Sequence, residues 1–369
     1  MTRVPDPTMR LDRLPLTYDE CRARFHRAAL EAELAVRSHP ISARGPHGQE
    51  LTIDIVTIGP AAPRRALLVL SGVHGVEGFV TSTLQTDLLS RLDRSALPAD
   101  VGIAVVHVVN PWGMAHDRRQ NESNVDLNRN WRRSDRDPEH NVAYDQLHAL
   151  ACPDTPTMPS FGDLMGVVGP IVAEHGVEWV RDGITKGQYR HADGLHFGGH
   201  RTEESCLVLE QAIPELLGSA DRVLIVDLHT GVGPLGALTL LSSEHPGSPQ
   251  DGFLRAAFGD VDATVGNPTS ASTLKSGPIA SGIADLLPQA ECFAVTPEFG
   301  TAGDMEQLAA TYQEQWVHRV GDLDDPEHRA ARWRYRCCFT PDDRDWERTA
   351  LEDGRRLLDQ AVSAVATWA

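Results

Sequence analysis

The chain has 369 residues, 41% of them hydrophobic, and carries a formal net charge of −18. This apolar content is enough for a sizeable core, and the length suits one large α/β domain. The acidic balance argues against nucleic acid and anionic membrane partners, because both bind basic faces. No stretch reaches the ~20 apolar residues that span a bilayer, and no secretory signal is visible. The six cysteines are scattered without metal-binding spacing, so we expect reduced thiols and a cytoplasmic protein.

Strands and helices alternate along the predicted chain. In chain order the predicted elements are a helix over 17–38, a turn over 42–48, strands over 51–58 and 65–71, a helix over 79–92, a strand over 101–109, a helical piece near 203–217, strands over 222–228, 237–241 and 292–296, and helices over 303–320 and 345–367. Residues 132–220 are otherwise less regular. Several strands are apolar without alternation, which is typical of strands covered on both faces. The pattern predicts a layered α/β/α sheet in one domain over residues 1–369.

Half of a metal site follows the apolar strand over 65–71. His74 and Glu77 stand three positions apart among glycines that permit a tight turn. Imidazole nitrogen and carboxylate oxygen are common zinc ligands, and catalytic zinc usually takes three protein ligands plus water. His-x-x-Glu occurs four times, at His47, His74, His175 and His200. Only the His74 copy follows a clear strand and precedes a plausible helix, so context selects it.

Three further polar stretches stand just past predicted strands, where ligands of open α/β sheets bind. One holds Arg119 and the pair Asn128-Arg129, and guanidinium groups of this kind grip carboxylates or oxyanions. A second ends at His229, the best-placed third metal ligand, although a packed core histidine is the common alternative. The third ends at Glu298, which suits a general base in a partly dry site and alternatively a structural ion pair.

Together these stretches resemble the zinc carboxypeptidases of the carboxypeptidase A type. The resemblance covers residues 65–131, 222–231 and 292–300, and Asp-Leu-Asn-Arg-Asn-Trp over 126–131 is its most specific piece. The order of the motifs along the chain is also that of the family. The resemblance implies a three-layer α/β/α fold with a mixed central sheet and one zinc ion per chain.

The resemblance also implies a role for each matching residue. The implied zinc ligands are His74, Glu77 and His229, and the implied general base and acid is Glu298. Arg119, with Arg118 as the alternative, would polarise the scissile carbonyl. Asn128 and Arg129 would bind the substrate's terminal carboxylate, and Asp126 would hold His74 in place. These residue types form a coherent hydrolytic set. Zinc acidifies water, a carboxylate moves the proton, and an arginine stabilises the developing negative charge.

The chain departs from the family between Arg129 and Glu298. No tyrosine stands between His229 and Glu298, where carboxypeptidases place a substrate-capping one. The segment over about 132–220 is longer than in those enzymes, and its Tyr189 is a candidate for the missing tyrosine. Lys275 is a candidate to face an acidic side chain of the substrate, with a solvated surface lysine as the alternative.

Several functions remain open at this point. The leading hypothesis is a zinc-dependent hydrolase that cleaves an amide bond next to a free carboxylate in small peptides. An amidohydrolase of N-acyl amino acids, similar to the succinylglutamate desuccinylase and aspartoacylase branch, is the alternative with the same site. A non-catalytic binding protein on this fold would be expected to have lost one of the site residues. A serine hydrolase is disfavoured because no Gly-x-Ser-x-Gly appears.

Overall fold

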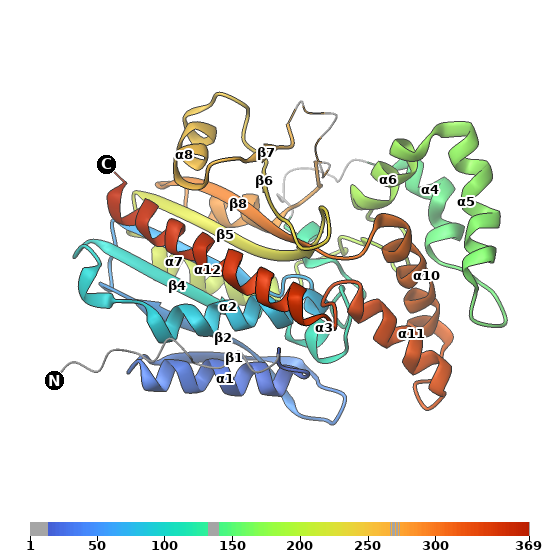
Figure 1. Ribbon diagram of the computed structural model, residues 1–369, viewed down its shortest axis with the longest axis horizontal. Helices are drawn as coiled ribbons and strands as arrows, with labels where there is room; N and C mark the ends of the chain where they lie inside the picture. Colours follow the sequence, from blue (N-terminus) through green and yellow to red (C-terminus); the bar gives the residue numbers. More distant parts are fainter. Residues whose placement is uncertain are drawn as a thin grey trace.

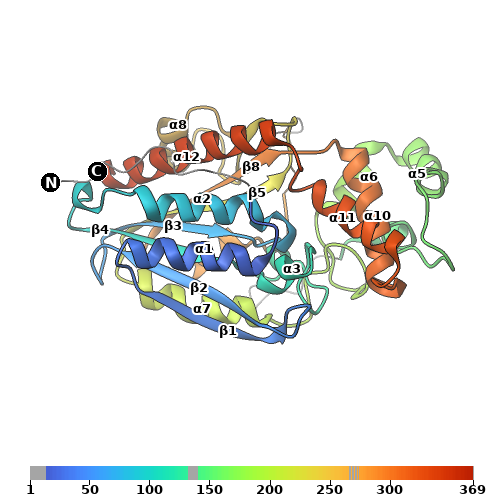
Figure 2. The same ribbon diagram turned by 60° about the horizontal axis from the view of Figure 1, so that its bottom comes forward.

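A computed structural model describes residues 14–131, 140–265, 267, 270, 272 and 274–368. Within these residues an eight-stranded sheet forms the centre of the molecule, in the order β1-β2-β4-β3-β5-β8-β6-β7 (Figures 1 and 2). Its strands are β1 (Val36–Arg44), β2 (Glu50–Ile58), β3 (Arg65–Ser71), β4 (Val101–His107), β5 (Arg222–Gly231), β6 (Leu238–Ser242), β7 (Asp262–Ala263) and β8 (Glu291–Gly300). β3 runs parallel to β4 and β5, and β5 to β8, whereas β2 and β6 pair antiparallel with their neighbours β4 and β8. The sheet is therefore mixed, as the family resemblance implies.

Helices cover both faces of this sheet and also gather at one end of it. They are α1 (Tyr18–Glu31), α2 (Gly78–Arg91), α3 (Pro111–Ala115), α4 (Val142–Ala151), α5 (Phe161–His175), α6 (Val177–Thr185), α7 (Glu204–Leu217), α8 (Pro249–Phe258), α9 (Ile279–Leu286), α10 (Asp304–Val320), α11 (Pro326–Cys337) and α12 (Arg344–Thr367). Leu67 and Val69 of β3 pack in one apolar cluster with α2, α8 and α12. Leu68 and Leu70, which point to the opposite face, pack in another with α7 and α9. The prediction of an α/β/α sheet with strands buried on both faces is confirmed.

The first predicted helix is wrong in its last third. α1 begins where the Thr17 side chain accepts a hydrogen bond from the Glu20 amide, and it ends at Glu31. Glu33 then adopts a φ of 55°, which breaks the helical path. Residues 36–44, predicted as the helix end and a turn, form the outermost strand β1.

The segment predicted as irregular contains three further helices. α4, α5 and α6 pack around Tyr144, Leu147 and Val180, and Tyr312 of α10 joins the same apolar cluster. Figure 1 shows these helices gathered with α10 and α11 at one end of the sheet. No helix among the described residues is both long and apolar enough to cross a membrane.

Candidate metal and active site

The loop after β3 places two of the predicted ligands. His74 precedes the short helix η1 (Gly75–Glu77), which leads directly into α2. The Val76 amide donates to the Arg118 carbonyl oxygen at 2.9 Å, which ties the loop to the segment after α3. A Cβ atom at Gly75 would lie 2.1 Å from the Gly113 carbonyl carbon, so this close approach requires glycine.

His74, Glu77 and His229 come together at the carboxyl ends of the parallel strands β3 and β5. His74 Nδ1 lies 2.8 Å from one Glu77 carboxylate oxygen, and His229 Nδ1 lies 2.8 Å from the other. The two Nδ1 atoms are 3.1 Å apart. All three side chains are at most 2% exposed. Two imidazole nitrogens and a carboxylate that converge on one buried point form a donor set that fits a divalent metal ion.

A second carboxylate stands behind each histidine. His74 Nε2 lies 3.3 Å from Asp126 Oδ1, and His229 Nε2 lies 2.8 Å from Asp227 Oδ2. Carboxylates in this position orient metal-binding imidazoles and increase their basicity. Asp126 is the residue predicted for this role, whereas Asp227 was missed. A signal for Asp227 exists, because it precedes His229 by two residues in a strand and therefore shares its face.

These carboxylates favour positive charge at the site. Burial alone would lower the pKa of His229, but Asp227 and Glu77 raise it to about 10. Burial likewise opposes the charged form of Glu77, yet His74 and His229 hold the pKa of that carboxyl well below its ordinary value. An electrostatic environment that stabilises a cation is the one that a metal site requires.

The two neighbouring arginines have different surroundings. The Arg119 guanidinium lies beside the candidate metal ligands, with Nη2 2.7 Å from His74 Nε2. It donates to Glu77 Oε1 at 3.2 Å and to Asp126 Oδ2 at 3.1 Å. Arg118 is fully buried and donates through Nε to Glu314 of α10 at 2.9 Å. Of the two, Arg119 is the one with its guanidinium at the site.

Glu298 approaches the site from the next strand. In the pairing of β5 with β8 it is the register partner of His229, and it is 4% exposed. The Val232 amide donates to its carboxylate at 3.3 Å. Burial is the main cause of a raised pKa at Glu298, and the nearby charge of Glu77 adds to it.

The predicted carboxylate-binding pair is also buried. Asn128 and Arg129 lie in the short helix η3 (Leu127–Arg129). Arg129 is 1% exposed, and its guanidinium donates to the backbone oxygens of Asn128 at 2.9 Å and Thr185 at 2.6 Å. The Tyr189 hydroxyl donates to the Arg129 backbone oxygen at 2.6 Å. Tyr189 thus lies beside η3, and its contact with a substrate stays a prediction.

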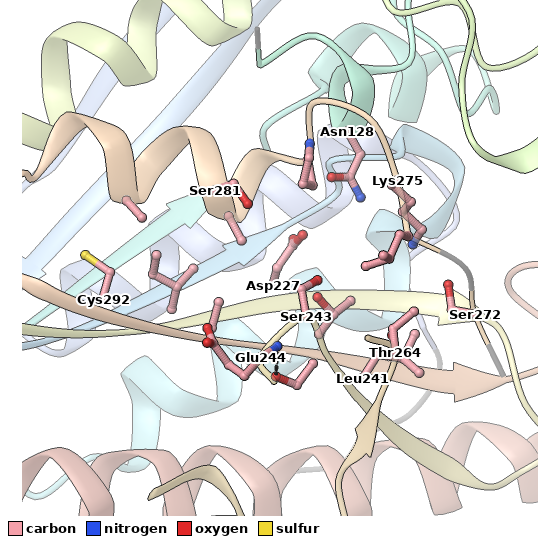
Figure 3. A pocket seen from close by; sticks show the side chains of 18 residues that line it. Asn128, Asp227, Leu241, Ser243, Glu244, Thr264, Ser272, Lys275, Ser281 and Cys292 are labelled. Atoms are coloured by element: carbon pink, nitrogen blue, oxygen red, sulfur yellow. Dashed lines mark hydrogen bonds between the residues drawn. The ribbon is translucent and has the colours of Figure 1, made fainter. Parts of the chain in front are cut away.

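A cavity of about 280 Å³ opens beside these residues, between β5, β6, β8 and α9. Asn128 and Lys275 lie at one end of it, Asp227 in its middle, and Glu244 and Cys292 toward the other end (Figure 3). Its walls mix apolar side chains with the hydroxyl-bearing residues Ser242, Ser243, Thr264, Ser272, Ser281 and Thr296. Lys275 therefore faces this cavity. The sequence alone had not decided between this position and a solvated surface position.

The other His-x-x-Glu copies lie elsewhere. The His175 ring stacks on Trp179, and His47 is exposed. A second group with metal-binding side chains is formed by His148, Cys152 and Asp193, near the end of α4. Two groups of His, Cys and carboxylate side chains in the described part of the chain could hold a metal ion. Of these two, only the His74 group is fully buried.

Comparison with known proteins places the chain in a family. A family model described as "Protein of unknown function (DUF2817)" matches residues 15–353. The chain belongs to this family. No curated protein matches the sequence of this DUF2817 member.

Solved structures of carboxypeptidases resemble this DUF2817 protein in fold. Thrombin activatable fibrinolysis inhibitor matches with a TM-score of 0.50 at 11% identity, over 96% of this chain and 75% of that chain. Carboxypeptidase A from Helicoverpa armigera matches with a TM-score of 0.45 at 16% identity, over 90% and 75% of the two chains. The murein-tripeptide amidase MpaA from Escherichia coli O157 matches with a TM-score of 0.41 at 20% identity, over 78% and 92%. The carboxypeptidase-like fold expected from the motifs is confirmed.

Proposed function

We propose that this DUF2817 protein is a zinc-dependent hydrolase that cleaves an amide bond next to a free carboxylate. The observation that carries the proposal is the convergence of His74, Glu77 and His229 on one buried point, with Glu298 on the adjacent strand. Two histidines and a glutamate that hold one metal ion, with a further carboxylate nearby, are the parts of a metallohydrolase site.

Each residue has a distinct task in the proposed reaction. Zinc bound by His74, Glu77 and His229 would supply Lewis-acid chemistry and an acidified water molecule. Glu298 accepts the proton of the attacking water and donates it to the leaving amine. Arg119 stabilises negative charge on the oxygen of the amide that is cleaved.

The carboxylate of the substrate is proposed to lie near η3. The side chain of Asn128 borders that place, and the cavity beside it has room for the side chain of the residue that carries the carboxylate. Small peptides and N-acyl amino acids both offer an amide next to a carboxylate. Both are therefore substrate classes for the test.

The first test is metal content, measured by elemental analysis after zinc supplementation. The wild type is expected to hold one zinc per chain, and His74→Ala and His229→Ala to hold none. His148→Ala is the matched control, because His148 belongs to the other metal-binding group and should keep the zinc of the proposed site. A wild type without zinc, or loss of zinc only in His148→Ala, would refute the proposed site.

The second test is turnover of paired substrate panels, one of peptides and one of N-acyl amino acids. Release of a free amino acid should depend on zinc and should fall at least about 100-fold in Glu298→Gln, because general acid–base catalysis contributes that much. The panel that is turned over decides between peptidase and deacylase. Undiminished turnover in Glu298→Gln would contradict the assigned role of Glu298.

A further inference from the structure

Lysine is rare in this chain, and one of its lysines faces the candidate site. The sequence contains 34 lysines and arginines together, and only Lys186 and Lys275 among them are lysines. Lys275 is partly buried and lines the cavity together with Asn128. In Figure 3 the two side chains lie at the same end of the cavity.

The backbone that follows Lys275 is fixed to the site. The Ser276 amide donates to the Lys186 backbone oxygen at 3.1 Å, and the Trp131 amide donates to the Gly277 oxygen at 3.3 Å. The Ile279 amide donates to the Asn128 side-chain oxygen at 3.0 Å. Three hydrogen bonds, two donated by Ser276 and Ile279 and one accepted by Gly277, therefore hold the segment after Lys275 next to η3 and its flanking residues.

Arg129 is poorly placed to meet a substrate directly. Its guanidinium is 1% exposed and is engaged by two backbone oxygens, and Asp126 lies 3.8 Å from its Nη1. Lys275, in contrast, presents its amine to the cavity. Among the described residues, no hydrogen bond or ion pair occupies that amine.

The charges around Lys275 favour the arrival of an anion. Burial is the main cause of a lowered pKa at Lys275, and the positive charge of Arg129 adds to it. Arg119 acts in the same sense, whereas Glu298 and Asp126 oppose it. A carboxylate that entered this end of the cavity would stabilise the charged form of the Lys275 ammonium group, which burial disfavours.

We propose that Lys275, together with the side-chain amide of Asn128, directly binds the free carboxylate of the substrate. The proposal rests on the proposed function and refines it. The Asn128 oxygen is occupied by the Ile279 amide, so its NH₂ group is the part left to donate to a carboxylate. Arg129 acts behind this pair by holding the backbone of η3. The cavity beyond Lys275 then receives the side chain of the same substrate residue.

A binding experiment tests this independently of turnover. Reductive ¹³C-methylation keeps the lysine charge and labels Lys186, Lys275 and the N-terminal amine, and the variants Lys186→Arg and Lys275→Arg assign the NMR signals. The zinc-loaded protein is titrated with N-acetyl amino acids, each as the free acid and as the carboxamide. We expect the Lys275 signal to shift saturably with the acids alone and the Lys186 signal to stay in place.

Two results of this titration would overturn the proposal. One is an acid that binds, as measured by calorimetry, without moving the Lys275 signal, or that moves it no more than the carboxamide does. The other is the absence of saturable binding for every acid in the panel. Failure of the wild type to hydrolyse any substrate would count against the proposed function alone, because the titration does not depend on turnover.

A kinetic comparison provides the second readout. Lys275→Met should reduce kcat/KM for carboxylate substrates by roughly 10- to 100-fold, the value of a hydrogen bond to a charged group, mainly through KM. The same substitution should leave kcat/KM for the matching carboxamides nearly unchanged. Lys186→Met is the control and should behave as the wild type with both. An equal loss for acids and carboxamides would mean that Lys275 has only a structural role.

Discussion

Replacing Asp227 by asparagine is expected to weaken metal binding about tenfold. Asp227 Oδ2 lies 2.8 Å from His229 Nε2, and both side chains are almost fully buried. The side chain of asparagine has the same length and also carries an acceptor oxygen, so the substitution removes only the negative charge of the acceptor. Hydrogen bonds to charged groups contribute about 1.5–3 kcal/mol and neutral ones about 0.5–1.5 kcal/mol. The difference of about 1.4 kcal/mol is about tenfold in a dissociation constant.

A graded series and a matched control sharpen this prediction. Asp227→Ala also removes the acceptor and should weaken binding by up to about 100-fold. Asp221→Asn is the control, because Asp221 precedes the other end of β5 and its side chain is 55% exposed. Zinc is titrated into the chelator-treated protein in competition with a chromophoric chelator. Wild-type affinity in both Asp227 variants, with the fold intact by circular dichroism, would refute the reasoning.

Two further predictions concern buried charges away from the metal ligands. Arg118→Met should lower the free energy of unfolding by roughly 3 kcal/mol, because Glu314 loses its closest charged partner, while Arg332 stays at 3.3 Å; an unchanged urea midpoint would contradict this. Burial lowers the pKa of His107 to about 4, whereas the unfolded chain binds that proton near pH 6.5. Stability should therefore fall by up to about 3 kcal/mol as the pH drops from 6.5 to 4, and His107→Gln should flatten that part of the pH profile. A profile with the same slope in both proteins would show that His107 does not cause it.

The central sheet was predictable because its strands carry a strong signal. β3 and β5 are apolar without alternation, and both of their faces are covered in the structure. Polar residues immediately after such strands had to meet at one edge of the sheet, which brought His74, Glu77 and His229 together. The edge strand β1 gave no such signal, because most of its side chains are solvent-facing and it contains Pro40. Helix α5 was missed because Gly166, Gly169 and Pro170 interrupt its periodicity, whereas α4 and α6 are only 10 and 9 residues long and give a weak periodic signal.

The sequence identified candidate site residues only where few residue types can perform the role in question. Candidate metal ligands come from a few side-chain types, so sequence context was enough to pick out three residues that the structure brings together, and their role as ligands stays a prediction. The distinction between Arg118 and Arg119 depends on which one meets Glu314, a residue almost 200 positions away in the chain. The orientation of Lys275 depends likewise on hydrogen bonds to Trp131 and Lys186, which lie far from it in sequence.

The end of α6 is a junction on which two parts of the site depend. The Thr185 oxygen accepts from the Arg129 guanidinium, and the next oxygen, that of Lys186, accepts from the Ser276 amide. Adding or deleting one residue in α6 would turn this end by about 100° about the helix axis. Both acceptors would then rotate away from their donors at once, and the segments that carry Asn128 and Lys275 would lose their support together. The length of α6 is therefore expected to be constrained by the positions of these two backbone oxygens, and variation in α6 should be confined to the turns farther from Thr185.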